Sequence, residues 1–480
     1  MDGFECDSLN LDCSTKHLII SQSKLAESNP LSAMNSPKRQ LGLTPSLAII
    51  IGTVIGSGVF IQLPIVQQAT GSPGLAIIAW LIGGLIWLPQ IFLLAEMGTA
   101  YPEQGFGYLY LQKAGSPALA FMYVWTVFWT SDTPSITILA IAAVAALDVF
   151  FPVLTDSALT KLIAASIIMA LTWVHVYSVN RGGRLQLLLT IVKLLPLILL
   201  CILGLFFLDS SNLFLVSRHA SDESLFVLLS AGVAATVWSY AGFPNILYMA
   251  GEIKNPGHTL PRALLGSLTV VTLIYVMVAT ATGALIPHSE LVAISGGFAN
   301  PFKYLPWIAV FAAGFLAVAA FTSMVGATNA CIMVQPRIEY AIARDGLFFP
   351  VFGKLHPRYG TPANSIMIQS GLAIIMIFIG GIEALMGYFT LSYILQNLAV
   401  YIVIFWLRKR EDYQPSYRSP AWRSMALLAI TFQILLLFGT FSAFPLGGIL
   451  TALVLILTGL PMYYYFKSRQ HKFSTPQKGQ

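Results

Sequence analysis

The feature that most constrains this chain is a glycine-rich interruption in its first long apolar run. Residues 43–68 are long and apolar enough to cross a bilayer as one helix, yet Gly56, Ser57 and Gly58 lie at the centre. Glycine and serine are poor residues for an uninterrupted helix, so we expect the helix to break there. In lipid, such a break is tolerated only where the freed backbone groups face protein or a watery cavity. The break is expected to line a binding site at mid-membrane depth, the alternative being a small-residue face for helix packing.

A second long apolar segment is interrupted in the same way, at WSYAGFP, residues 238–244. Pro244 removes a backbone donor, and Gly242 loosens the turn. Interrupted apolar segments at corresponding positions of two halves are typical of repeat-built secondary transporters. The half-helix that begins near Gly58 would present free amides to an anion such as a carboxylate.

The composition is that of a polytopic membrane protein. Of 480 residues, 56% are hydrophobic and only 10% are charged. The four cysteines lack CxxC spacing, so we expect neither a disulfide framework nor a metal site, and no cofactor. The sequence contains no HExxH, GxSxG or P-loop motif, which argues against an enzyme.

Apolar runs long enough to span a bilayer predict twelve transmembrane helices, and hence an all-α membrane protein. They cover residues 43–68, 73–97, 117–148, 159–178, 185–208, 224–252, 261–287, 304–343, 362–380, 384–407, 422–442 and 446–466. With an even number of spans, both termini lie on the same side of the membrane.

The distribution of basic residues indicates which side that is. This helix arrangement places 22 of the 26 Lys and Arg residues on the side of the termini, and only Lys161, Arg218 and Lys303 on the other. Cytoplasmic loops carry such an excess, so both termini are predicted to be cytoplasmic in the cell (inner) membrane. The net charge of +6 has the same explanation, and we expect no nucleic-acid partner.

The two broken helices also predict the domain organisation. Five spans separate their starts, and an odd number inverts the second broken helix, so helices 1–5 and 6–10 are expected to form a five-plus-five inverted repeat. Helices 11 and 12 stand outside the repeat, where they either support the core or form a homodimer contact. The expected segments are a flexible cytoplasmic tail at 1–40, the first repeat at 41–208, the second at 223–408, helices 11 and 12 at 422–466, and a cytoplasmic tail at 467–480.

Four motifs give the chain a resemblance to the amino acid-polyamine-organocation superfamily, and within it to the L-type amino acid transporters and related bacterial permeases. The motifs are GTVIGSGVF in helix 1, AEMGTAYPEQGFGYLYL after helix 2, VWSYAGFPNILYMAGEIKNPGHTLPRA across helix 6 and QPRIEYAIARDGLFFP ending helix 8. They cover roughly residues 40–410 in the order and spacing of the family. The resemblance implies amino acid transport by alternating access, without ATP.

The resemblance also implies a substrate site at the two breaks. In the family, backbone amides at the positions of Ser57 and Gly58 hold the substrate carboxylate, and an aromatic residue at the position of Trp238 closes the pocket. Carbonyls at the positions of Val54, Trp238 and Ala241 hold its ammonium. The expected substrate-binding residues at the breaks are Val54, Ile55, Gly56, Ser57, Gly58, Trp238, Tyr240, Ala241 and Gly242. Backbone dipoles at two broken helices can hold a zwitterion without burying a counter-charge.

Lys193 lies well inside predicted helix 5, with no acidic residue nearby in sequence. An intramembrane lysine is a functional-site hypothesis by default, with snorkelling to the membrane surface as the alternative. Sodium-independent members of the family carry a lysine at the matching place, where its ammonium replaces a sodium ion. The resemblance then implies carbonyl partners near Gly52 and Ile55, and the polar pair Thr328 and Asn329 of helix 8.

Asp132 is the other conspicuous charge, in predicted helix 3. Facing the cavity, it would accept a proton or attract a basic substrate side chain; facing a neighbouring helix, it would be structural. Ser131 and Ser135 are placed to share its face with the substrate pocket.

Three other ionisable residues lie near predicted helix ends. Glu96 and Glu252 meet the cytoplasm, where we expect them to be structural partners of arginines. His175 is interpreted as a helix-terminal group rather than a proton relay.

The sequence therefore predicts a secondary active amino acid transporter, either a sodium-independent exchanger or a proton-coupled symporter. The alternatives are a transporter-like amino acid sensor, and an antiporter of cationic amino acids or polyamines. Some antiporters of the superfamily carry an acidic residue shortly after the second-break glycine, whereas Phe243 and Pro244 follow Gly242 here, which weakens the latter reading. Some members of the resembled family are joined to a partner through an external cysteine near helices 3 and 4; no such cysteine exists here, so we expect no covalent partner.

Overall fold

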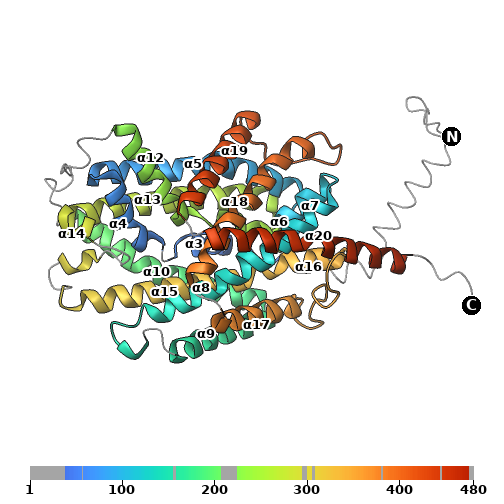
Figure 1. Ribbon diagram of the computed structural model, residues 1–480, viewed down its shortest axis with the longest axis horizontal. Coiled ribbons are helices and arrows are strands. Elements are labelled where there is room, and N and C mark those ends of the chain that lie inside the picture. Colours follow the sequence, from blue (N-terminus) through green and yellow to red (C-terminus); the bar gives the residue numbers. More distant parts are fainter. Residues whose placement is uncertain are drawn as a thin grey trace, which may run out of the picture. The chain divides into compact units, whose positions relative to one another are not determined.

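The computed structural model describes residues 38–56, 58–154, 158–206, 224–293, 300–304, 309–379, 382–443 and 446–474. From Arg39 onward the chain forms one compact unit. Within the described ranges the regular elements are helices, apart from an isolated β-bridge between Leu41 and Ile253 (Figure 1). This architecture confirms the all-α part of the predicted fold class.

The elements of the first half are α3 (Leu43–Val54), α4 (Gly58–Thr70), α5 (Pro73–Ala100), α6 (Phe106–Lys113), α7 (Pro117–Thr126), the π-helical η1 (Val127–Asp132), α8 (Thr133–Ala145), the 3₁₀ turn η2 (Pro152–Leu154), α9 (Ala158–Tyr177) and α10 (Val179–Phe206). Those of the second half are α12 (Leu225–Thr236), the 3₁₀ segments η4 (Val237–Tyr240) and η5 (Phe243–Glu252), α13 (Pro256–Leu285), α14 (His288–Ala293), the 3₁₀ turns η6 (Pro301–Tyr304) and η7 (Ala309–Phe311), α15 (Ala312–Val334), α16 (Pro336–Arg344), α17 (Ala363–Ile379), α18 (Ile382–Leu407), α19 (Trp422–Ala443) and α20 (Leu446–Ser474).

Seven helices in the described part of the chain are long and apolar enough to cross a membrane. Four shorter apolar helices accompany them, and α3 and α12 are two of these. Both are short because each is one half of a predicted span: α3 stops at Val54 before α4 begins, and α12 gives way to 3₁₀ segments. The helices at both breaks thus end where glycine and proline interrupt the apolar runs.

Some boundaries differ from those predicted by hydrophobicity. The helix expected from residue 304 begins at Ala312, after a 3₁₀ turn. The short helix α6 was not predicted, because it is too short to register as a membrane span. The last helix, α20, runs to Ser474, past the apolar run and into the segment predicted as a tail. Helical hydrogen bonding does not stop where hydrophobicity stops.

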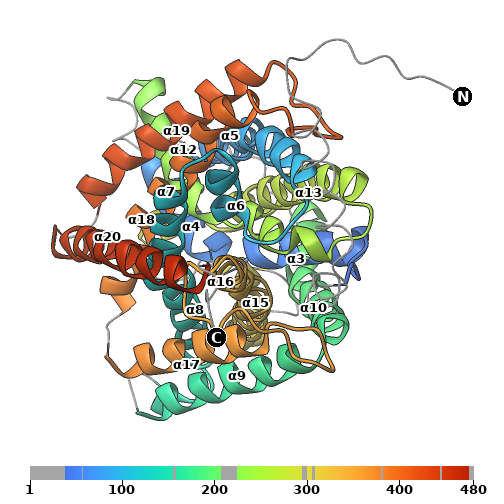
Figure 2. The ribbon, with the colours of Figure 1, turned by 90° about the vertical axis from the view of Figure 1, so that its right-hand side faces the viewer.

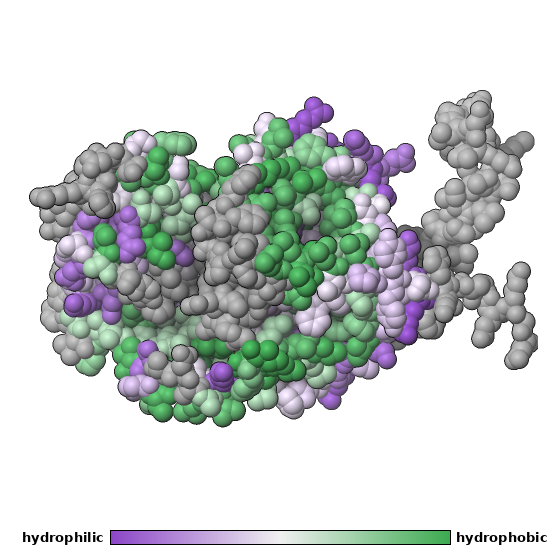
Figure 3. Space-filling model, viewed as in Figure 1, coloured by the Kyte–Doolittle hydropathy of each residue, from purple (hydrophilic) through white to green (hydrophobic). Residues whose placement is uncertain are grey.

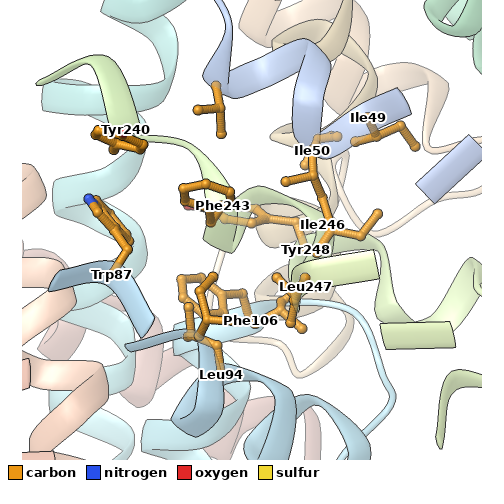
Figure 4. Packing of buried hydrophobic residues seen from close by; sticks show 14 of the residues in the cluster. Ile49, Ile50, Trp87, Leu94, Phe106, Tyr240, Phe243, Ile246, Leu247 and Tyr248 are labelled. Atoms are coloured by element: carbon orange, nitrogen blue, oxygen red, sulfur yellow. The ribbon is translucent and has the colours of Figure 1, made fainter. Parts of the chain in front are cut away.

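The core surrounds the two breaks. The N-terminal half of the first broken helix, α3, packs against α10, α13, α15 and η5, so elements distant in sequence meet at its surface (Figures 1 and 2). Figure 4 shows Ile49 and Ile50 of α3 beside Phe243 and Ile246 of η5. These side chains are fully buried, so the backbone of both breaks is held by tightly packed apolar groups.

A second group of helices packs beside this core. Helix α15 packs along α8, and α9 packs along α17 (Figure 2). On the outer surface of α9 and α17, large apolar side chains are exposed (Figure 3). Examples are Leu162, Met169, Met367, Ile375 and Phe378. An apolar outer surface over long helices is what a lipid environment requires.

Two buried glutamates near helix ends are paired with arginines, as predicted. Glu252 accepts hydrogen bonds from Arg337 Nε at 3.0 Å and Gln104 Nε2 at 2.8 Å. Its main-chain carbonyl accepts from the amides of Gln40 and Leu41 at 2.8 and 3.0 Å. The segment that precedes the first broken helix is therefore fixed to the end of the second.

Glu96 at the end of α5 is held by four donors. Arg408 contributes Nε at 2.7 Å and Nη2 at 2.6 Å, the Tyr413 hydroxyl lies at 2.9 Å and the Ser419 amide at 2.8 Å. The glutamate side chain is fully buried. A fully satisfied carboxylate of this kind joins α5 to the segment that follows α18.

We predict that Arg408→Met destabilises the protein, because it leaves the buried Glu96 carboxylate without its cation. Removing one partner of a buried ion pair costs about 3–5 kcal/mol. The melting temperature of the purified protein in detergent should fall clearly. Arg410→Met is the matched control, since Arg410 pairs with Asp412 at the surface, where such pairs contribute little. Equal melting temperatures for the two variants would contradict this reading of Glu96.

Candidate substrate and coupling site

The first break leaves a short non-helical stretch between α3 and α4. Ile55 adopts an extended conformation, with φ −78° and ψ 90°, and its amide donates to the Ile51 carbonyl. The Gly56 amide donates to the Val54 carbonyl at 3.0 Å. Ser57 lies outside the described residues, and α4 begins at Gly58. Because the helical ladder stops here, carbonyls of α3 need other donors.

The second break crosses the first. Gly242 has φ +121°, a conformation that L side chains rarely adopt, and a Cβ there would lie 3.1 Å from the Thr53 carbonyl carbon. A Cβ on Gly58 would lie 3.1 Å from the Ser239 Cα. Glycines at these positions therefore allow the two interrupted backbones to approach closely.

Hydroxyl groups join the two breaks. The Tyr275 hydroxyl of α13 lies 3.2 Å from the Val54 carbonyl and 2.9 Å from that of Ser239. Thr53 Oγ1 lies 3.2 Å from the Gly242 carbonyl. The Gly242 amide lies 3.4 Å from the hydroxyl of Tyr393. Sequence reasoning missed Thr53, Tyr275 and Tyr393, because nothing in their own segments marks them as neighbours of a break.

Aromatic rings surround the second break. Tyr240 is fully buried, donates its hydroxyl to the Trp80 carbonyl at 2.8 Å and packs edge-on against Tyr275. The rings of Trp87 and Phe243 pack with centroids 5.5 Å apart (Figure 4). Of the predicted site residues here, the Trp238 side chain lies outside the described part of the structure. Ala241 lies in the turn between η4 and η5.

The Lys193 ammonium lies on the freed carbonyls of α3. Its Nζ donates to the Gly52 carbonyl at 2.7 Å and also to that of Ile55, and the side chain is 1% exposed. Ser323 of α15 donates from Oγ to the same stretch, 3.2 Å from the Ile55 carbonyl and 3.0 Å from that of Gly56. Lysine and serine therefore supply hydrogen-bond donors that the broken helix lacks.

The polar pair expected beside Lys193 makes other contacts. Thr328 Oγ1 donates to the Met324 carbonyl of its own helix at 2.8 Å. Asn329 Nδ2 donates to Gln186 Oε1 at 2.7 Å, and its Oδ1 lies 2.9 Å from His175 Nε2. His175 is thus bonded across to α15 near the end of α9, and Ser323 is an α15 residue that bonds to the first break.

The π-helical stretch η1 and the first turn of α8 carry the remaining predicted residues. Ser131 Oγ lies within hydrogen-bonding distance of Gln396 on α18, 3.2 Å from its Nε2. Ser135 Oγ accepts from Gln335 Nε2 at 3.0 Å. The two serines therefore contact different helices, α18 and the α15–α16 junction. Asp132 lies between them and is buried, and π-helical turns of this kind are frequent at functional sites.

Comparisons with known proteins agree with these features. The amino acid permease family model matches residues 41–466. The serine/threonine exchanger of Bacillus subtilis is 30% identical over 445 residues, which cover 91% of this chain and 98% of that protein. The mouse b(0,+)-type amino acid transporter 1 is 26% identical, covering 92% of this chain and 90% of that protein. The human cystine/glutamate transporter is 28% identical, covering 89% and 85%.

The family model spans nearly all of the described chain, including both breaks and the helix that carries Lys193. These relatives are transporters, and the apolar helices fit the membrane environment in which such proteins work. The chain therefore belongs to the amino acid permease family, and is a multi-pass membrane transporter rather than an enzyme.

Proposed function

We propose that this protein is a sodium-independent secondary transporter of amino acids that works by alternating access. The observation that carries the proposal is the Lys193 ammonium on the Gly52 and Ile55 carbonyls, at the point where the first broken helix ends. A compact cation bonded to helix-end carbonyls provides the charge that a bound sodium ion would otherwise supply.

The substrate site of the proposal lies where the two breaks cross. Free amides at the start of α4, from Ser57 and Gly58, would hold the substrate carboxylate, and carbonyls at Val54, Trp238 and Ala241 its ammonium. Support comes from the close approach of Gly58 to Ser239 and of Gly242 to Thr53. Ile55, Gly56, Tyr240, Ser131 and Ser135 complete the proposed lining.

For the membrane arrangement we propose twelve spans in a five-plus-five inverted repeat. The repeats would cover residues 41–208 and 223–408, followed by helices 11 and 12 at 422–466. The protein would lie in the cell (inner) membrane, with both termini in the cytoplasm. Helices 11 and 12 remain available for a homodimer contact.

The sensor and cationic-antiporter alternatives differ in what the purified protein does. Counterflow in proteoliposomes, loaded in turn with each proteinogenic amino acid, tests the transport proposal. We expect exchange of labelled amino acid for unlabelled substrate. Binding detected by thermal shift, without any exchange, would favour a sensor. Exchange restricted to lysine, arginine or polyamines would favour the antiporter.

We predict that Gly58→Leu abolishes uptake, because the side chain would meet the Ser239 backbone and block the amides at the start of α4. Uptake of a labelled amino acid mixture should fall to background at matched protein levels. Gly371→Leu is the control, since a Cβ at Gly371 meets no atom within 4 Å. Uptake by the Gly58 variant equal to that of the control would contradict the proposed binding of the substrate carboxylate at Gly58.

We predict that uptake continues unchanged when sodium is replaced by choline. The expected reason is that Lys193 already provides the positive charge at the carbonyls of α3. The measurement is initial uptake of the labelled mixture into proteoliposomes at constant pH and membrane potential. A clear rise in uptake with sodium would count against the proposal.

We predict that Lys193→Met still binds substrate but exchanges it at least about tenfold more slowly. Methionine keeps the length and apolarity of the stem and loses the charge and all three donors. Thermal shift reports binding and counterflow reports exchange. Lys161→Met, in which the lysine lies near the start of α9 and away from the breaks, is the matched control. Exchange at the wild-type rate would mean that the ammonium has no coupling role, and loss of binding would place Lys193 in the substrate pocket.

A further inference from the structure

Two buried carboxyl groups have no role in the site described so far. Asp132 is the last residue of η1 and is 6% exposed, and Glu339 lies on α16 and is fully buried. Among the described residues neither forms an ion pair, whereas the buried Glu96 and Glu252 both pair with arginines. Unpaired buried carboxyl groups are rare and require an explanation.

These two groups lie on facing helices. In Figure 1, the chain runs through η1 and α8 in the direction opposite to α15 and α16, and α8 packs along α15. Gln335 Nε2 donates to Ser135 Oγ at 3.0 Å and fixes the register of the pair. Asp132 precedes Ser135 by three residues, and Glu339 follows Gln335 by four. Because the two helices run in opposite directions, both carboxyl groups lie about one helical turn from that hydrogen bond, toward the same end of the helix pair. Their carboxyl groups are near enough to interact electrostatically.

Several buried side-chain oxygens around Asp132 and Glu339 accept no hydrogen bond from the described residues. Asp132 Oδ2 and Glu339 Oε2 have no hydrogen-bond partner in the described part of the structure. Gln369 Nε2 reaches Glu339 Oε1 at 3.5 Å, but the side-chain oxygens of Gln369 and Gln335 are likewise buried and unpartnered. While both carboxyl groups are ionised, these four oxygen atoms can only accept, and the described part of the structure supplies no donor to them.

Among the described residues of the surrounding helices, the cationic side chains have other partners. Arg337 bonds to Glu252, the Lys193 ammonium lies on carbonyls of α3, and Arg344 lies over the ring of Tyr340. Helix α17 carries no titratable residue in its described range. The other titratable groups that interact with Asp132 from packed elements carry no basic side chain: they are Tyr123 of α7, Tyr248 of η5, Cys331 of α15 and Tyr393 of α18.

A proton is the occupant that these observations favour. Two ionised carboxyl groups in a buried space repel each other, and protonating one removes the repulsion and creates an O–H donor for an orphan acceptor. A metal ion would need more ligands, and the described residues contain no cluster of three or more His, Cys, Asp or Glu side chains that could hold one.

We propose that Asp132 and Glu339 together bind one proton that is carried across the membrane with the substrate. The inference rests on the proposed transport function and selects proton symport among its forms. The proton is taken up by a carboxylate oxygen from the extracellular solution, stays in the O–H bond during the transition, and is released to cytoplasmic water. Arg337, two residues before Glu339, pairs with Glu252 at the end of η5, so this helix is tied to the second broken helix.

The experiment compares wild type with Asp132→Asn and Glu339→Gln in proteoliposomes that enclose a pH-sensitive dye. An equimolar ¹⁴C-labelled mixture of the proteinogenic amino acids is added outside at a lower pH. Dye and label together give the number of protons that enter for each amino acid. We expect this ratio to fall at least about fivefold in both variants, whatever their absolute rates. Glu103→Gln, at an exposed glutamate, is the matched control and should keep the wild-type ratio.

A second measurement does not depend on transport. The purified wild type should show the C=O stretching band of a protonated buried carboxyl in infrared difference spectra between two pH values, and each variant should lose it. Variants that keep the wild-type proton ratio, or keep the band, would overturn the proton site. Wild-type protein that exchanges amino acids without acidifying the lumen would overturn it too, while leaving the transport function intact. Absence of any amino acid movement by wild type would instead refute the transport function.

Discussion

A helix that stops inside a membrane leaves carbonyl groups without donors. In the central part of this structure, side chains from other helices donate hydrogen bonds to these carbonyls. Lys193 and Ser323 donate to the carbonyls of Gly52, Ile55 and Gly56, and Tyr275 reaches that of Val54. These donors come from α10, α15 and α13, three elements far apart in the sequence. The break is therefore tolerable because the surrounding helices meet at it.

The same arrangement provides the substrate site that we propose. Close approach of Gly58 to Ser239 and of Gly242 to Thr53 brings two interrupted backbones together, where amide and carbonyl dipoles can be directed at one small ligand. Packing of Trp87, Tyr240 and Phe243 holds the second break in place. Rigid apolar packing behind a polar backbone opening is a common way to fix the geometry of a small-molecule site.

Charged groups in the interior differ in how they are compensated. Glu96 and Glu252 are ionic anchors that connect helix ends, each with an arginine and further donors. Asp132 and Glu339 have no such cation among the described residues. Anchors of the first kind hold elements together permanently, whereas an uncompensated pair can change its charge by binding a proton, and this difference separates structural carboxyl groups from those that we assign to coupling.

The sequence alone determined the membrane class, the location of both helix breaks and the position of Lys193 within a long apolar helix, because hydrophobic length and the residues glycine and proline act locally along the chain. It also indicated that Glu96 and Glu252 would meet arginines. Only the tertiary structure decided which partners converge. Ser323 lies at the first break in place of Thr328 and Asn329, Ser131 and Ser135 contact different helices, and Glu339 lies near Asp132. Such contacts depend on the register between helices that are far apart in sequence, and local periodicity carries no information about that register.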